Sequence, residues 1–442
     1  MRPPRLLVLP LLLVAALSAG CGGSPDGQGL GVGGSDRTLA IVGTSDIADS
    51  NLFAAVLKPG FEKAYPQYTV TYQGNATAQA MAFAKTGQFS ALIVHAASLE
   101  NQFVADGFST APYGRAIFWG DFVLLGPKND PAGVMSGGAA TADPAAAFAK
   151  IAAAGAAGKA HFIARETGAG TDVTSHKIWA TTTGVATCAV STENGGGAMP
   201  STASGDCDTS SPAYPSWYTV TGAKQGANVQ YADVCSPASG APDCYVFTDR
   251  GTYDYLASTG ALSTVRPVVE GDSGLLVNSF HAYAINPDAV PDGSKVNSAA
   301  ATAFLDWITS PSGQKAVGSY LAETGDAPFR PDAAPVIRLD ATVRNAIAGT
   351  LANVVPGTPS LSGQKVTLEV AGKPVASALT DAQGRFSIAH ARPAGSDCAL
   401  TTGPITQVED ATLHPAFGDL LQPAVLALCA GAPTSPSARA EG

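Results

Sequence analysis

Residues 165–171, with the sequence RETGAGT, combine residue types that can hold an anion. They follow the apolar residues 161–164 and lead into a helix-like run that ends near Trp179. Arg165 supplies a permanent positive charge with a fork of donors, the glycines let the backbone approach a ligand closely, and a helix beginning near Thr171 offers unpaired N–H groups. An ordinary strand-turn-helix corner with Arg165 as a surface charge explains these residues equally well. Other parts of the chain are therefore needed to choose between an anion site and an ordinary corner.

Hydroxyl-bearing residues follow two apolar runs near the start of the chain. Thr44 and Ser45 come directly after the first run, and Thr77 follows the second. The alternation of apolar runs with helix-like runs predicts a parallel α/β sheet, in which ligands gather at the carboxyl ends of the strands. We therefore expect these hydroxyls to face one crevice. The expected strands are residues 38–43, 69–72 and 91–94, and the expected helices are residues 51–64 and 78–86.

The N-terminus indicates export. Residues 1–20 contain Arg2, Arg5, an apolar run and then small residues, which is typical of a secretory signal peptide. The residues before Cys21 resemble a bacterial lipobox, which implies cleavage before Cys21 and lipidation of its thiol. A membrane-spanning helix explains the N-terminus less well than a signal peptide does, because the apolar run is short. A Gly- and Ser-rich tether, residues 21–37, follows it. We expect a lipid-anchored protein on the periplasmic or extracellular side of the cell membrane.

The composition fits a folded extracytoplasmic protein. The chain has 442 residues, of which 45% are hydrophobic and 14% charged, so it can form the cores of two or three domains. Its formal net charge of −10 disfavours nucleic acid as a partner. The net charge does not exclude a small anion as a ligand, since a few hydrogen-bond donors in a cleft are enough to bind one.

Seven cysteines are present, and Cys21 is assigned to the lipid. The other cysteines are even in number, and in an exported chain this favours disulfides over metal ligands. No CxxC spacing occurs and no His lies near a second His or a Cys at ligand spacing, so we expect no metal site and no cofactor. Proximity in the sequence pairs Cys188 with Cys207, Cys235 with Cys244, and Cys398 with Cys429.

Short segments spread over residues 38–332 resemble the tungstate-binding members of the periplasmic solute-binding protein superfamily of ABC importers, and they occur in the family's order. The resemblance implies an α/β, two-lobed periplasmic-binding-protein fold of type II that closes around an oxyanion. It also implies an ABC permease in the membrane as the partner, and we expect a monomer without enzymatic activity. The segments are residues 75–80, 94–96, 120–127, 130–133, 217–218, 248–253, 275–278 and 310–314.

The resemblance also assigns the groups that hold the anion. Hydroxyls and amides after the first two strands, together with the Arg165 corner, imply tungstate or molybdate as the favoured ligand. Ala76, Ala78 and Ala169 depart from the family's pattern, and the hydroxyl lost at Ala169 removes a hydrogen bond worth about 1.5–3 kcal/mol. The implied oxyanion-binding residues are Thr44, Ser45, Ser50, Thr77, Arg165, Gly170 and Thr171.

Carboxylates near this site keep a phosphate-type ligand open. Hydrogen phosphate retains a proton, which Asp46, Asp49 or Glu166 could accept, whereas tungstate and molybdate need donors only. The simpler explanation of Asp46 and Asp49 is that they cap the following helix. A surface adhesion or sensing protein with a degenerate binding domain is the alternative from a different functional class.

The resemblance divides the solute-binding domain, residues 38–335, into two lobes. We expect its hinge strands to run through residues 120–125 and 273–280. Lobe one is expected to comprise residues 38–121 and 275–332, and lobe two residues 122–274.

Two motifs in this domain allow a second interpretation. Thr248, Asp249 and Arg250 either line the cleft or form an internal ion pair that fixes the return strand. Residues 271–274, GDSG, look like the nucleophile motif of trypsin-like proteases, with His95 and Asp121 in the matching order. The alternating α/β pattern contradicts a pair of antiparallel barrels, so we reject the protease interpretation.

The composition changes after residue 332. Residues 336–354 indicate a short amphipathic helix, so we expect a helix and linker over residues 336–358. The following alternating runs resemble small β-sandwich modules similar to carboxypeptidase regulatory domains, which predicts an all-β module over residues 359–434. It would serve as a spacer or as a carbohydrate- or partner-binding module. The expected strands are residues 364–370, 375–379 and 385–388.

Overall fold

The computed structural model describes residues 37–428 except 112–113, 203–206, 208–211, 237–239, 272–273, 323–326, 332, 334–335, 341–344, 353–360, 394–397 and 406–421. The predicted signal peptide, Cys21 and Cys429 lie outside the described residues, as does part of the GDSG motif. Within the described ranges, no helix is both long enough and apolar enough to cross a bilayer.

A 10-stranded mixed sheet forms the larger part of the described chain. Its parallel pairs are β1 with β2 and β3, and β5 with β8 and β9, as the alternation of strands and helices predicts. The three strands expected near the N-terminus are confirmed. In sheet order the strands are β2 (Thr69–Asn75), β1 (Thr38–Thr44), β3 (Ala91–Val94), β11 (Val277–Ala284), β4 (Arg115–Pro127), β9 (Cys244–Asp249), β5 (His161–Ala164) and β8 (Tyr218–Val220), and both β10 (Val265–Val269) and β12 (Arg330–Pro331) pair with β4.

Helices cover this sheet and divide its apolar side chains into separate cores. The core around Phe61 and Phe304 belongs to the first lobe, and the core around Phe148 and Trp179 belongs to the second. The first lobe contains α1 (Ser45–Asp49), the π-helical turn η1 (Phe53–Leu57), α2 (Lys58–Ala64), α3 (Thr77–Ala84), α4 (Ala97–Ala105), α9 (Ser298–Ile308) and α10 (Pro311–Gly318). The second contains α5 (Pro144–Ala156), α6 (Gly170–Thr181), α7 (Gln225–Val234) and α8 (Arg250–Ser258). The α/β class and the two lobes are thereby confirmed.

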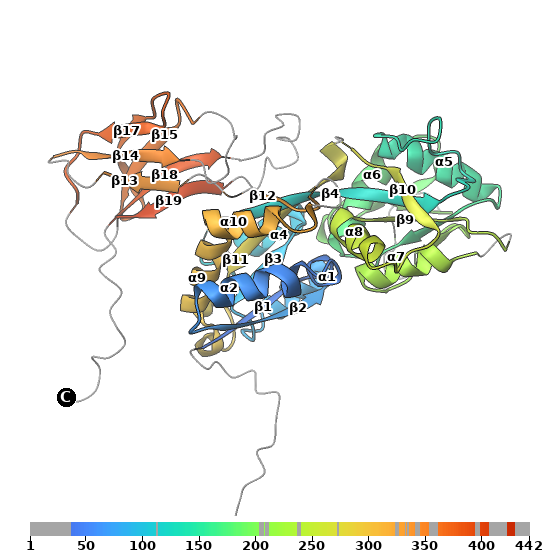
Figure 1. The fold of residues 1–442 in the computed structure, drawn as a ribbon, viewed down its shortest axis with the longest axis horizontal. Helices are drawn as coiled ribbons and strands as arrows, with labels where there is room; N and C mark the ends of the chain where they lie inside the picture. Colours follow the sequence, from blue (N-terminus) through green and yellow to red (C-terminus); the bar gives the residue numbers. More distant parts are fainter. Residues whose placement is uncertain are drawn as a thin grey trace, which may run out of the picture. The chain divides into compact units, whose positions relative to one another are not determined.

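Strand β4 belongs to both lobes and runs without interruption from one to the other (Figure 1). Its first part pairs with β11, and its second part pairs with β9 from Phe122 onward. The aromatic packing changes at the same point, since Phe118 contacts Phe280 and Phe122 contacts Phe247. The boundary between the cores therefore lies within the segment where we expect a hinge.

An ion pair sits beside this boundary. The Arg250 guanidinium donates from Nε to Asp121 Oδ1 (2.7 Å) and from Nη2 to Asp121 Oδ2 (2.6 Å). The same Nη2 donates to Glu270 Oε2 at 3.1 Å. Of the two roles open to Arg250, the structure therefore shows the internal ion pair, which ties the start of α8 to β4.

The C-terminal part is all-β, and the helix expected over residues 336–354 is wrong. Instead, β13 (Val336–Leu339) and β14 (Ile347–Ala352) form a sheet with β17 (Arg385–Ile388). Burial alternates residue by residue along β14, which is the two-residue period of a strand rather than the period of a helix. The unit therefore begins before residue 359, its predicted start.

A second sheet completes this unit, in the order β16-β15-β18-β19. Both sheets contribute to one apolar cluster that includes Leu351, Val366 and Leu400. The three strands expected here are confirmed, whereas the resemblance to carboxypeptidase regulatory domains stays a prediction. The strands are β15 (Lys365–Val370), β16 (Lys373–Leu379), β18 (Cys398–Ile405) and β19 (Gln422–Ala427).

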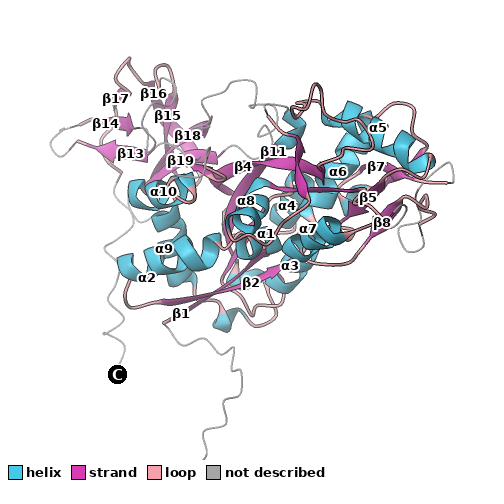
Figure 2. Cartoon of the chain, turned by 45° about the vertical axis from the view of Figure 1, so that its right-hand side comes forward, coloured by secondary structure: helices cyan, strands magenta, loops and turns pink. Residues whose placement is uncertain are grey.

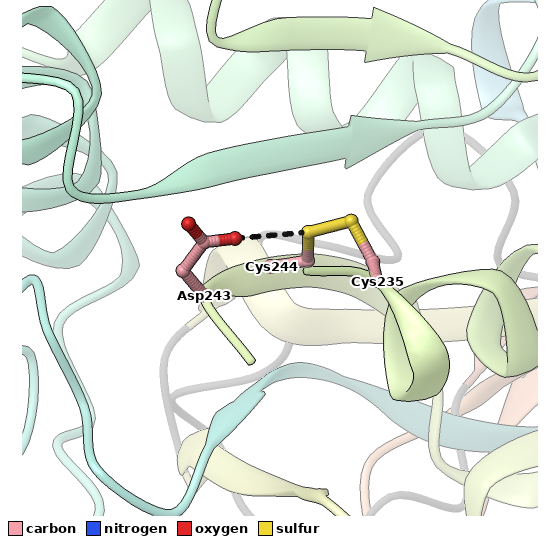
Figure 3. A group of neighbouring side chains, drawn as sticks. All are labelled: Cys235, Asp243 and Cys244. Carbon is pink, nitrogen blue, oxygen red and sulfur yellow. Dashed lines mark hydrogen bonds between the residues drawn. A yellow bond between two sulfur atoms is a disulfide. The ribbon is translucent and has the colours of Figure 1, made fainter. Parts of the chain in front are cut away.

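Two of the three predicted disulfides join described cysteines and are confirmed. Cys188 bonds to Cys207 beside the hairpin of β6 (Thr187–Val190) and β7 (Gly197–Pro200), and Cys235 bonds to Cys244. Asp243 lies next to the second disulfide, with its Oδ1 3.5 Å from Cys244 Sγ (Figure 3). Because the two sulfurs are bonded to each other, they are not thiolates, and this group is no metal site.

Candidate functional site

A small cavity lies between the two lobes, where β1, β2 and β5 end and where α1, α3, α6 and α7 begin. The space open to the centre of a water-sized sphere is about 10 Å³, which is room for about one water molecule. Helices α1, α7 and α8 lie side by side at this edge of the sheet (Figure 2). The cavity is lined by Thr44, Ser45, Asp46, Asn75, Ala76, Thr77, His95, Arg165, Ala169, Gly170, Thr171 and Gln225.

The structure brings six of the seven predicted anion-binding residues to this cavity. They come from strand ends of both lobes, which is where the parallel topology places them. Ser50 is the exception. Its hydroxyl donates to Ile47 O (3.4 Å) and accepts from Leu52 N (3.4 Å), so it supports the turn after α1 instead.

Arg165 is the central charged group and is 3% exposed. Its Nη1 donates to Gln225 Oε1 at 2.7 Å and to Ser45 Oγ at 3.3 Å. Its Nη2 donates to Glu166 Oε1 at 3.2 Å. The bond to Ser45 crosses from lobe two to lobe one, so Arg165 links the lobes as well as lining the cavity.

The N-termini of two helices face the cavity, and no side chain caps either helix. The residues that precede α3 and α6 are Ala76 and Ala169, and neither has a side chain that can cap the helix. Thr77 Oγ1 is fully buried and has no hydrogen-bond partner among the described residues. A buried hydroxyl at the start of a helix is suited to a ligand that accepts hydrogen bonds.

Asp46 and His95 form a buried ion pair at the cavity wall, with 3.0 Å between His95 Nε2 and Asp46 Oδ2. Burial alone would raise the pKa of Asp46, but the charge and hydrogen bond of His95 hold it below its usual value. Burial alone would lower the pKa of His95, but Asp46 holds it above its usual value. The Asp46 and His95 charges offset each other, and Arg165, whose partner Glu166 is 35% exposed, is the buried positive group of the cavity.

The carboxylates near the cavity all have partners. Besides His95, Asp46 accepts from Ile47 N at 3.2 Å, and Glu166 accepts from Arg165. Asp49 Oδ2 accepts from Gly226 N (3.0 Å) across the lobes, and burial raises the pKa of Asp49. Asp46 and Asp49 therefore make tertiary contacts and do not cap the helical segment that follows, since neither η1 nor α2 has a side-chain cap.

Sequence reasoning assigned no role at the anion site to three polar residues that line the cavity, Asn75, His95 and Gln225. The sequence suggests a role for His95 only as part of a protease, yet His95 follows β3, whose carboxyl end reaches the same edge of the sheet. Its partner is Asp46, and Asp121 is held by Arg250, so His95 and Asp121 do not form a catalytic pair. No local pattern indicates Gln225, which opens α7 and reaches the cavity through the tertiary fold.

Comparison with known proteins identifies the family. A sequence model of the PBP superfamily domain matches residues 31–312. A Haloferax volcanii protein assigned as an ABC transporter anion-binding protein is 31% identical over 317 residues, covering 71% of this chain and 76% of that protein. Tungstate-binding protein TupA of Peptoclostridium acidaminophilum is 26% identical over 331 residues, covering 74% of this chain and 98% of that protein.

Solved structures include tungstate-binding protein TupA from Desulfovibrio alaskensis G20, which is 28% identical with a TM-score of 0.47 and covers 67% of this chain and 99% of that chain. A tungstate ABC transporter structure from Geobacter sulfurreducens is 27% identical with a TM-score of 0.48, covering 65% and 100%. The match to residues 31–312 and the 31% identical relative show that this chain belongs to the PBP superfamily of binding domains.

Proposed function

We propose that the protein captures a tetrahedral oxyanion, with tungstate or molybdate favoured, and delivers it to an ABC permease. The observation that carries the proposal is the buried guanidinium of Arg165, which shares one cavity with Thr44, Thr77 and Thr171 and with the N-termini of α3 and α6. Buried positive charge, hydroxyls and amide donors together match the acceptor-only surface of a deprotonated oxyanion. The functions named for the two relatives, anion binding and tungstate binding, point to the same class.

The partners of the carboxylates favour tungstate or molybdate over phosphate. Hydrogen phosphate needs an acceptor for its proton, and the three candidates are Asp46, Asp49 and Glu166. Of the three, only Asp46 lines the cavity, and its carboxylate is already paired with His95 and Ile47 N. An anion without a proton needs donors only and does not compete with these contacts, so it is the better fit.

The two-lobed fold supports a role in delivery. Opening and closing of the lobes at β4 and β11 would expose and bury the anion. Lipidation at Cys21 would keep the protein on the periplasmic or extracellular face of the membrane, near the permease. The proposal includes a monomer, as the resemblance to solute-binding proteins implies.

Isothermal titration of the purified protein with tungstate, molybdate, sulfate and phosphate tests the proposal. We expect one-to-one binding of tungstate or molybdate that Arg165→Ala abolishes. Arg37→Ala, which removes a positive charge outside the cavity, is the matched control and should bind as the wild type does. If none of the four anions gives heat with either the wild type or a variant, the proposal is contradicted. The surface adhesion or sensing role is then the favoured interpretation.

A further inference from the structure

We infer that Gln225 sets the affinity of this site, because its amide oxygen occupies the position on Arg165 and Thr171 that an anion oxygen would take. The inference rests on the proposed function and goes beyond it. Gln225 is then a specificity-determining residue that competes with the ligand, rather than one that binds it.

The contacts of the amide oxygen carry this inference. Gln225 Oε1 accepts from Arg165 Nη1 at 2.7 Å and from Thr171 Oγ1 at 3.1 Å. A guanidinium only donates, so the atom that faces it must be the amide oxygen and not the amide nitrogen. Two donors of the predicted anion site, one after β5 and one in α6, therefore converge on an oxygen that the protein itself supplies.

The rest of the side chain is held in this position. Gln225 is 1% exposed, and its Nε2 donates to Thr248 Oγ1 at 2.6 Å. Its backbone is the first residue of α7, and the next amide, Gly226 N, donates to Asp49 Oδ2 in the other lobe. The side-chain amide of Gln225 is thus held through its nitrogen, and its backbone is held at the start of α7. The contact with Arg165 is therefore fixed by the surrounding structure.

An oxyanion cannot join this arrangement without displacing the amide oxygen. The cavity has room for about one water molecule, and an oxyanion with four oxygens is larger. An anion oxygen beside Oε1 would also place two acceptors against each other. A charged acceptor binds a guanidinium more strongly than a neutral amide does, so a dianion can displace Gln225 where a weaker ligand cannot.

The test compares three variants by isothermal titration with tungstate and with phosphate. Gln225→Met keeps the length of the side chain but removes the competing acceptor, and we expect tungstate binding to tighten about tenfold. Gln230→Met makes the same change at an exposed position of the same helix and should leave the affinity unchanged. Thr248→Val removes the acceptor that holds the Gln225 amide, so it should also tighten binding, and it covers the case in which Gln225→Met does not fold.

The outcomes separate this inference from the proposed function. Weaker or unchanged binding by Gln225→Met and Thr248→Val, with normal binding by the wild type, overturns the competition and leaves the proposed function intact. Tighter binding supports both. Binding by Gln225→Met when the wild type gives no heat also supports the inference and the proposed function. If the wild type, Gln225→Met and Thr248→Val all give no heat, the inference and the proposed function are both contradicted.

Discussion

The replacement of Asp249 by Asn should stabilise the protein at pH 8 and not at pH 4. Asp249 ends β9 and precedes α8, where its Oδ1 accepts from Thr252 N at 2.7 Å, and it is 1% exposed. Burial, followed by the negative charge of Asp46, raises the pKa of this carboxyl to about 7 from 3.8. The wild type therefore holds a protonated acid up to neutral pH at the end of β9.

The sign and size of the effect follow from this pKa. Between pH 3.8 and 7 the unfolded chain loses the proton while the folded chain keeps it, so a rise in pH lowers the free energy of unfolding. Each pKa unit corresponds to about 1.4 kcal/mol, so the loss above pH 7 is of the order of 4 kcal/mol. Asparagine can accept the same hydrogen bond from Thr252 N but does not ionise, so Asp249→Asn avoids this loss.

Urea unfolding at pH 4 and pH 8, followed by the fluorescence of the buried Trp179 and Trp307, measures the difference. We expect wild type and Asp249→Asn to be similar at pH 4 and the variant to be more stable by up to about 4 kcal/mol at pH 8. Asp288→Asn, at an exposed carboxylate, is the control and should show no such change. An equal difference between Asp249→Asn and wild type at both pH values would refute the reasoning.

Three further changes test other contacts. Thr77→Val removes the unpaired buried hydroxyl, so tungstate affinity should fall about tenfold in a titration while the unfolding midpoint holds; unchanged affinity would show that Thr77 does not touch the anion. Arg250→Met leaves Asp121 without its partner, and we expect urea unfolding to show a loss of about 3–5 kcal/mol; a loss below about 1 kcal/mol would contradict this. Replacing both Cys235 and Cys244 by Ala opens a short loop of sequence separation 9, which should lower stability by about 2–3 kcal/mol, and an unchanged urea midpoint would count against the estimate.

The fold of the N-terminal part could be predicted because local and global signals agree there. The run that becomes β1 is apolar on both faces, as a strand buried inside a parallel sheet requires, and β3 is buried at every residue. The carboxyl ends of parallel strands lie at one edge of their sheet, so the strand pattern alone is enough to place Thr44 and Thr77 together. The pattern of residues 165–171 singles out Arg165 as an anion-binding candidate, and the resemblance to solute-binding proteins decides for that role over an ordinary surface charge.

The C-terminal part misled the same reasoning because its spacing is ambiguous. Ile347 and Leu351 are four residues apart, which places them on one face of a helix and equally on one face of a strand. The pairing of Leu351 with Ile337, and of Ile347 with Ile388, decides for strands. Those partners come from other segments, so no periodicity within residues 336–354 could reveal them.

The site shows the same limit at the level of single contacts. The sequence places the carboxylate of Asp46 near the anion, but its charge is cancelled by His95, which lies 3.0 Å away and comes from the end of another strand. Gln225 belongs to no motif and is brought to Arg165 only by the start of α7. Sequence patterns predict which residues end strands and open helices, whereas the pairing of side chains across the lobes depends on how those elements pack.

The contacts that hold the lobes together surround the cavity itself, and this links closure to binding. Ala78 N donates to Gly168 O (3.1 Å) across the lobes, and a Cβ at Gly168 would lie 3.0 Å from that of Ala78, so the close approach needs small residues at both positions. With the bond from Gly226 N to the Asp49 carboxylate, these contacts involve residues that do not line the cavity, so an anion does not have to replace them. Contacts that hold the lobes together offset part of the cost of closure, so less of the binding energy of the ligand is needed for it. The space between the lobes holds about one water molecule, so they must part to admit an oxyanion, and the rate of association should be limited by lobe opening and not by diffusion of the anion.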